Sequence, residues 1–161
     1  EVISDTSPIQ YLHQVDLLDI LAKLYGRITI SQAVADELSQ GRALGINLPD
    51  LSLLPWIGVG QVREGALLPM VTDLGGGERE ALAMALETPG ALLLLDDALA
   101  RRYARMLGLV FTGTLGVLLR AKEAGLVPAL QPVLERLETL HFWLDAATRV
   151  AALRRAGEIG P

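Results

Sequence analysis

Short aliphatic runs alternate along this chain with longer segments of helical periodicity, and the alternation leaves few fold classes open. The runs are rich in residues that suit buried strands, whereas the longer segments repeat their apolar residues every three to four positions. We expect strands within residues 2–4, 27–31, 56–59, 91–95 and 109–112. We expect helices within residues 7–26, 31–41, 76–88, 98–108, 115–125, 128–140 and 142–157. Strands and helices in this order predict an α/β fold, with a mostly parallel central sheet flanked by helices on both faces.

Composition favours one packed domain over residues 1–161, with its last helices from about residue 128. The chain is 51% hydrophobic and its mean hydropathy is +0.38, which excludes disorder. The longest apolar run is far shorter than the roughly 20 residues that span a membrane, and the opening residues carry no basic stretch. We therefore expect neither a membrane segment nor a signal peptide. The absence of cysteine excludes disulfides and thiolate metal sites and agrees with a cytoplasmic location.

Carboxylates follow the ends of two predicted strands. Asp5 follows the first strand, and Asp96 and Asp97 follow the strand at 91–95. Because parallel strands share a direction, these side chains are expected at the same edge of the sheet, where open α/β sheets bind ligands. Structural roles compete with this interpretation, since Asp5 suits a helix cap and the later pair suits a cap plus a first-turn acid.

Two further acids belong to predicted helices. Glu37 shares a helical face with the apolar residues Ala33 and Val34, where an acid is costly unless it is paired or binds metal. Alternatively, Glu37 lies on a solvated face beside Asp36. Glu78 follows three glycines at a helix start, a position that suits any acid because of the helix dipole. The glycines also indicate that the backbone approaches another group closely at this point.

Several carboxylates at one sheet edge repel one another and raise each other's pKa. A hard divalent cation such as Mg²⁺ or Mn²⁺ removes this repulsion, because it prefers oxygen ligands and retains several waters. Such a site activates water and stabilises the charge that develops when a phosphodiester is cleaved. The net charge of −5 argues against a protein that coats nucleic acid non-specifically, but a bound metal would offset the acids of a nuclease locally.

Five segments, in this order, resemble the PIN-domain superfamily, and more narrowly a branch related to the VapC-type toxin ribonucleases: VISDTSPI, VADEL, GGGEREALAMA, LLLLDDALARRYARMLGL and TGTLGVLLRAKEAGL. The resemblance covers about residues 2–140. It implies a parallel sheet flanked by helices, cleavage of RNA with Mg²⁺ or Mn²⁺, a homodimer and inhibition by a cognate antitoxin. The metal-binding acids that it implies are Asp5, Glu37, Glu78 and one of Asp96 and Asp97.

The third acid departs from the pattern of the resemblance. VapC-type toxins usually place an aspartate inside this helix, whereas here the acids are Glu78 and Glu80. The residues alone leave the choice between the two glutamates open.

Basic and hydroxyl side chains near these acids are candidates for substrate binding. Arg101 and Arg105 share a helical face directly after the acidic pair and are placed to hold phosphates. The hydroxyls of Ser7 and Thr114 are further candidates at the same edge, although helix capping explains both. A solvated, salt-bridged face is the competing interpretation for the arginines, and we favour it for Arg102.

Three isolated aromatic residues, Trp56, Tyr103 and Trp143, have faces on which bases can stack. At their spacing such residues are more often part of the core, and we expect them there.

Other carboxylate-based α/β folds do not fit the order of motifs. The first acid lacks the second aspartate of a haloacid-dehalogenase-like phosphatase, and the acidic pair comes too late for a response-regulator receiver. The glycine-rich stretch matches neither a Rossmann turn nor a P-loop. The leading hypothesis is a metal-dependent endoribonuclease, the toxin of a toxin–antitoxin pair. The alternative is a non-catalytic PIN-like binding module that acts in a protein or RNA complex.

Overall fold

The computed structural model describes residues 1–66 and 68–161 and contains a five-stranded sheet in which every neighbouring pair is parallel. The strands are β1 (Val2–Ser4), β2 (Ile28–Ser31), β3 (Ile57–Gly60), β4 (Leu92–Leu94) and β5 (Val110–Thr112). The helices are α1 (Thr6–Gln14), α2 (Ile20–Tyr25), α3 (Gln32–Ala43), α4 (Gly76–Leu86), α5 (Ala98–Met106), α6 (Thr114–Glu123), α7 (Gln131–Thr139) and α8 (Ala146–Arg155). Short 3₁₀ turns lie at Leu51–Leu53 and Leu68–Met70. The predicted α/β fold with a parallel sheet is confirmed.

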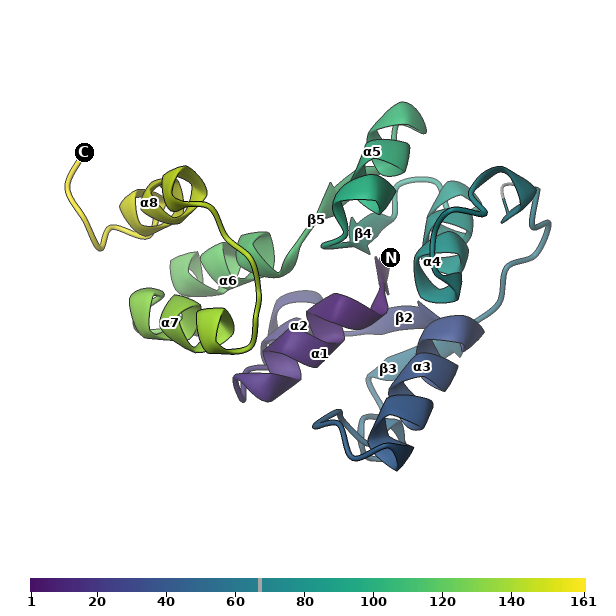
Figure 1. Cartoon of the computed structure of the whole chain (residues 1–161), viewed down its shortest axis with the longest axis horizontal. Coiled ribbons are helices and arrows are strands. Elements are labelled where there is room, and N and C mark those ends of the chain that lie inside the picture. Colours follow the sequence, from purple (N-terminus) through teal and green to yellow (C-terminus); the bar gives the residue numbers. More distant parts are fainter. Residues whose placement is uncertain (67) are drawn as a thin grey trace.

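Helices cover both faces of the sheet, which makes a three-layer α/β/α arrangement (Figure 1). Alternate residues of each strand point to opposite faces. Ile3 and Leu93, which are register partners, belong to the core cluster formed with α4 and α5. Ile30 and Leu94 belong to the larger cluster, formed with α1, α2, α3 and α6. The C-terminal helices α7 and α8 extend this larger cluster beyond α6, at one end of the molecule (Figure 1).

The first predicted helix is in fact two, and the break has a clear cause. Asp16 adopts a left-handed backbone with φ of 59°, and the N–H groups of Asp16 and Leu17 return to carbonyls of the last turn of α1. This turn ends α1 in the pattern of a Schellman cap. The Arg136 guanidinium of α7 then donates to the carbonyl oxygens of Gln14 and Val15, at 3.1 and 3.0 Å.

Gly41 does not end its helix as expected, because α3 continues to Ala43. The glycine serves close packing instead, since a Cβ at this position would overlap the side chain of Leu48. Ser31 caps α3 as expected, and its hydroxyl accepts the N–H of Val34 at 3.1 Å. Within the described residues, no helix has the length and apolar character needed to cross a membrane.

Candidate functional site

The strand order β3-β2-β1-β4-β5 places the reversal of chain direction between β1 and β4. From β1 the chain moves to β2 and β3 on one side of the sheet, and β4 and β5 fill the other side. Ligands of open α/β sheets bind in the crevice at the carboxyl ends of the two strands at such a point. Asp5 directly follows β1, and its N–H donates to the carbonyl of Leu94 at 3.0 Å. The first acid and the acidic pair after β4 therefore lie at the same edge of the sheet.

Asp5 occupies the N-cap position of α1, yet within the described chain its side chain makes no capping hydrogen bond to that helix. The residue is 2% exposed, and among the described residues its Oδ1 atom finds no hydrogen-bond partner. Burial raises the pKa of Asp5 to about 8, with further contributions from the negative charges of Glu78, Glu37 and Asp96. The simple capping role does not account for this carboxylate.

Glu37 reaches the same place from α3. Its carboxylate accepts the N–H of Gly77 at 2.9 Å and the hydroxyl of Thr6. A Cβ built on Gly77 would lie 2.7 Å from Glu37 Oε2 and 3.0 Å from Asp5 Oδ1. The glycine therefore leaves the space in which the two carboxylates approach the start of α4, which explains the close approach that the glycine run indicated.

The two glutamates of α4 have different surroundings. Glu78 lies in the first turn, and burial raises its pKa, together with the charges of Asp97 and Glu37. The Glu80 carboxylate instead accepts the N–H of Ala33 at 2.9 Å, at the start of α3. Glu78 is also the acid whose charge acts most strongly on Asp5. The structure thus gives Glu80 a capping role and leaves Glu78 facing the other acids.

Asp96 and Asp97 diverge after β4. Asp96 accepts the N–H and the hydroxyl of Thr114 at 2.7 and 2.6 Å, and burial raises its pKa although these bonds and the charge of Arg101 oppose the shift. Asp97 caps α5 by accepting the N–H of Ala100 at 2.9 Å. Each of the two acids therefore accepts a hydrogen bond that holds a helix start. The negative charge of Asp96 also raises the pKa of Asp5, and that of Asp97 raises the pKa of Glu78.

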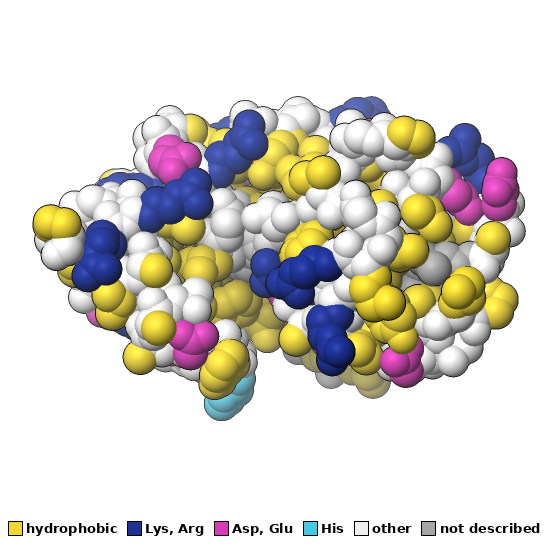
Figure 2. Space-filling model, turned by 90° about the horizontal axis from the view of Figure 1, so that it is seen from above, with side chains coloured by type: hydrophobic (Ala, Val, Ile, Leu, Met, Phe, Trp, Pro, Cys, Tyr) yellow, Lys and Arg dark blue, Asp and Glu magenta, His cyan; other side chains and the backbone are white. Residues whose placement is uncertain are grey.

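A cleft of about 840 Å³ opens beside these acids. Ser7, Arg101 and Arg105 line it, together with Glu78, Asp96 and Asp97, whereas Thr114 is fully buried behind Asp96. Figure 2 shows Lys and Arg side chains beside the hollowed middle of the face seen from above. The guanidiniums of Arg101 and Arg105 lie 5.2 and 5.4 Å from the ring centre of Phe111. Within the described chain the buried Nε of Arg101 has no hydrogen-bond partner.

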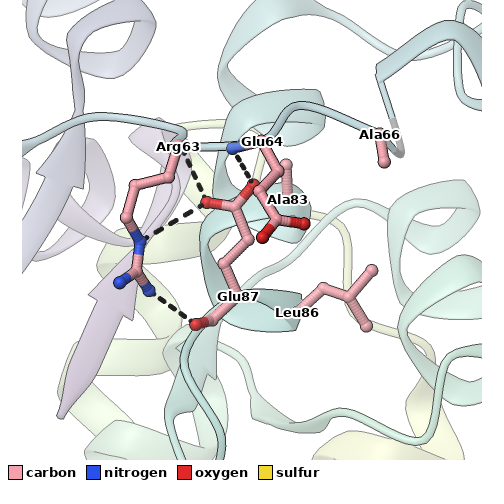
Figure 3. A pocket seen from close by; sticks show the side chains of 6 residues that line it. All are labelled: Arg63, Glu64, Ala66, Ala83, Leu86 and Glu87. Carbon is pink, nitrogen blue, oxygen red and sulfur yellow. Dashed lines mark hydrogen bonds and ion pairs between the residues drawn. The ribbon is translucent and has the colours of Figure 1, made fainter.

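A smaller cavity, of about 390 Å³, lies on another part of the surface and has a structural explanation (Figure 3). Its carboxylate, Glu87, accepts the N–H groups of Arg63, Glu64 and Gly65 at 2.7, 2.9 and 3.0 Å. The Arg63 guanidinium donates to the backbone carbonyl of Glu87 at 2.7 Å. These bonds fasten the loop at 63–65 to the end of α4 and give the Glu87 carboxylate a structural role.

The acidic edge fits a divalent cation in its donor chemistry. Over residues 1–66 and 68–161, no group of three or more His, Cys, Asp or Glu side chains is arranged as a ready-made metal site. Nevertheless, Asp5 Oδ1 has no partner among the described residues, the Glu37 and Asp5 carboxylates both lie over Gly77, and the acids repel one another. A hard cation with oxygen ligands would relieve this repulsion and give Asp5 Oδ1 a partner.

Sequence reasoning did not single out Gly77 or Thr6, although the glycine run was a usable signal. It also expected all three isolated aromatic residues in the core. Trp56 packs against the larger cluster, and the Tyr103 hydroxyl donates to Asp73 at 3.0 Å. Trp143, in contrast, is 81% exposed and lines the cleft, so the expectation for it was wrong.

The parallel sheet, the flanking helices and the acids at the switch in strand order define a three-layer α/β/α protein with an acidic crevice. A family model described as a PIN domain matches residues 1–158, and the chain therefore belongs to the PIN-domain family. Members of this family are generally nucleases and typically use a divalent metal. A comparison with curated proteins found no significant match.

Proposed function

We propose that this protein is a divalent-metal-dependent endoribonuclease that acts as the toxin of a toxin–antitoxin pair. The observation that carries the nuclease proposal is the Asp5 carboxylate, which is buried, lacks a partner for Oδ1 among the described residues, and is surrounded by other acids at the switch in strand order. The toxin assignment rests on the resemblance of the five segments to the VapC-type branch. This proposal includes an RNA substrate in the cytoplasm, a cognate antitoxin and a homodimer. Exposed apolar residues such as Met106 at the end of α5 and Val110 in β5 offer surface for the homodimer.

The residues that would hold Mg²⁺ or Mn²⁺ are Asp5, Glu37, Glu78 and one of Asp96 and Asp97. When bound there, the cation supplies an activated water and neutralises charge on the scissile phosphate.

The chain's own groups prepare this site. Gly77 N–H and the Thr6 hydroxyl orient Glu37, and the buried Thr114 orients Asp96. Asp5 must lose its proton before it can act as a ligand. Its raised pKa therefore makes protons competitors of the metal below about pH 8.

Arg101, Arg105 and Ser7 line the cleft and are proposed to hold the phosphates on either side of the bond that is cleaved. Arg101 suits this role best, because its buried Nε has no partner in the described structure and its planar guanidinium rests on Phe111. A guanidinium can bind a phosphate through two parallel hydrogen bonds.

The proposal is tested by cleavage of a mixed RNA pool with Mn²⁺, with EDTA as the control. The wild type should cut the pool, and Asp5→Asn should lower turnover on the order of 100-fold or more, because it removes an interaction made mainly in the transition state. The matched control is Asp36→Asn on α3, which also changes an aspartate to asparagine. The exposed Asp36 carboxylate accepts the Gln32 side-chain N–H at 2.8 Å and does not line the cleft. A wild type that shows no metal-dependent cleavage, or an Asp5→Asn variant as fast as the wild type, contradicts the proposal.

A second candidate function, a non-catalytic binding module, is favoured by the hydrogen bonds that already occupy Glu37, Asp96 and Asp97. A module of this kind would bind RNA equally well with Mn²⁺ and with EDTA, and it would leave the RNA intact.

A further inference from the structure

The aromatic side chain of Trp143 is 81% exposed, although both of its neighbours in sequence pack against the core. Phe142 and Leu144 are both partly buried and pack against the larger core cluster. The Phe142 ring meets the Tyr11 ring of α1 edge to face, with 4.9 Å between ring centres and an angle of 82°. The indole is therefore exposed within an anchored segment rather than at a loose end.

The backbone on both sides of Trp143 is fixed by helix ends. After α7, His141 takes a left-handed conformation with φ of 63°. The N–H groups of His141 and Phe142 donate to the carbonyls of Glu138 and Leu137 at 3.1 and 3.0 Å, which is the pattern of a Schellman cap. Two residues after Trp143, Asp145 caps α8 by accepting the N–H of Thr148 at 2.7 Å. An exposed aromatic side chain on such a support loses little conformational entropy when it binds a ligand.

The indole shares one cleft with the acids and the arginines. Trp143, Glu78, Asp96, Arg101 and Arg105 all line the same cavity of about 840 Å³. The cavity thus has an aromatic surface contributed by the segment between α7 and α8, cations contributed by α5, and acids at the sheet edge. The notch in the face shown in Figure 2 lies between the C-terminal helices and the rest of the molecule.

One class of ligand matches all three kinds of group. A single-stranded nucleic acid presents phosphates for the arginines and an unstacked base for the indole, and aromatic stacking of this sort tolerates any base. A duplex keeps its base faces stacked inside the helix, where an indole on a protein surface does not reach them. An acidic peptide could pair with the arginines, but it has no aromatic ring next to each negative charge on which the indole could stack.

We propose that Trp143 is a base-stacking platform that binds one unpaired nucleobase of the RNA in the cleft beside the acidic edge. This inference rests on the proposed nuclease function and adds a base-binding residue to its substrate site. Trp143 acts in binding, and it takes no part in the cleavage chemistry.

The test measures binding of a short fluorescein-labelled oligouridylate by fluorescence anisotropy in EDTA, so that the RNA is not cleaved. Trp143→Ala should weaken binding about 5- to 150-fold, the range for loss of one stacked base, whereas Trp143→Phe should retain most of the affinity. The matched control is Leu44→Ala, which removes an apolar side chain that is also 81% exposed but lies at the end of α3. Thermal unfolding should be the same for all these variants, because the side chains changed are exposed.

Two further arms show that stacking is the cause. In a Trp56→Phe background Trp143 is the only tryptophan of the 161 residues, and its fluorescence should be quenched when the oligonucleotide binds. An RNA duplex, which hides its base faces, should bind wild type and Trp143→Ala with equal affinity.

The outcomes separate this inference from the proposed function. If Arg101→Ala weakens binding and flattens its salt dependence by about one phosphate contact, RNA binding in the cleft stands. If Trp143→Ala then binds the single strand as tightly as the wild type, the stacking platform is overturned and the indole is left as a surface for a protein partner. If the wild type binds no single-stranded RNA at all, both the platform and the proposed function fall.

Discussion

Two groups of carboxylates in this molecule have opposite surroundings. Glu87 and Glu158 each accept backbone N–H groups from a distant segment, whereas Asp5 is buried and, among the described residues, leaves one oxygen without a partner. Glu158 accepts the N–H groups of Leu130 and Gln131 at 2.6 and 3.0 Å and so ties the C-terminal residues to the start of α7.

The pKa shifts of the two groups follow from these contacts. For Glu87, burial would raise the pKa, but hydrogen bonds from three N–H groups outweigh it and the pKa is lowered. Asp5 has a pKa raised to about 8, because burial and the neighbouring acids both oppose its charge. Ionisation therefore stabilises the fold at Glu87 and destabilises the metal-free fold at Asp5. The direction of the pKa shift thus distinguishes acids that fasten loops from acids whose charge lacks a compensating partner, as in a cation site.

The contrast predicts opposite pH dependences, and the effect at Asp5 should be the largest. Between about pH 4 and pH 8 the folded protein keeps the Asp5 proton that the unfolded chain releases, so stability without metal falls as pH rises. The slope from this one group is at most about 1.4 kcal/mol per pH unit. Asp5→Asn should remove that slope, which urea unfolding in EDTA measures. If the two proteins have the same pH profile, Asp5 is not buried in the protonated form.

Glu87→Gln should change the pH dependence of stability in the opposite sense to Asp5→Asn. The Glu87 contribution is fully present above the pKa of the unfolded side chain and is lost as pH falls through the lowered pKa of the folded state. Loss of the charge that accepts three N–H bonds should cost about 2 kcal/mol of the free energy of unfolding near neutral pH, and little in acid. RNA cleavage should not change, because Glu87 lies outside the cleft. A large loss of cleavage at full stability would contradict the division into two groups.

Two adjacent glycines at the start of α4 test the packing around the Glu37 and Asp5 carboxylates, with a smaller expected effect on stability. Gly77→Ala should destabilise the protein by about 1 kcal/mol, because the new Cβ meets the oxygens of Glu37 and Asp5. Gly76→Ala is the control, since its Cβ has only the Ala33 Cβ nearby, at 3.7 Å, and alanine suits a helix better than glycine. The measurement is thermal unfolding of both variants. Equal melting temperatures would mean that the carboxylates do not depend on the space over Gly77.

The strands and the acids at their ends could be predicted from the sequence, because they depend on the periodicity of neighbouring residues. The parallel sheet could be predicted from the alternation of strands and helices along the chain. The sequence did not reveal the break between α1 and α2, since the left-handed backbone at Asp16 is supported by Arg136, 120 residues away. The sequence pointed to Glu78 but left the choice between Glu78 and Glu80 open. Only the packing of α4 against α3 gives Glu80 the Ala33 N–H as a partner.

The exposure of Trp143 could not be predicted from the sequence either. An isolated tryptophan in sequence is best placed in a core, and its two neighbours do pack there. The direction of the middle side chain depends on the turn at His141 and the cap at Asp145, which only the assembled helices define.

The central claim, that the acids at the sheet edge form one cation site, is tested most directly by thermal unfolding with and without Mn²⁺. At a metal concentration about 100 times Kd, the wild type should gain roughly 2.7 kcal/mol, or about 5–10 °C in Tm. Asp36→Asn should show the same gain. Asp5→Asn should melt higher than the wild type in EDTA near pH 8 and lose most of the rise with Mn²⁺. Equal rises in wild type and Asp5→Asn would contradict a shared site.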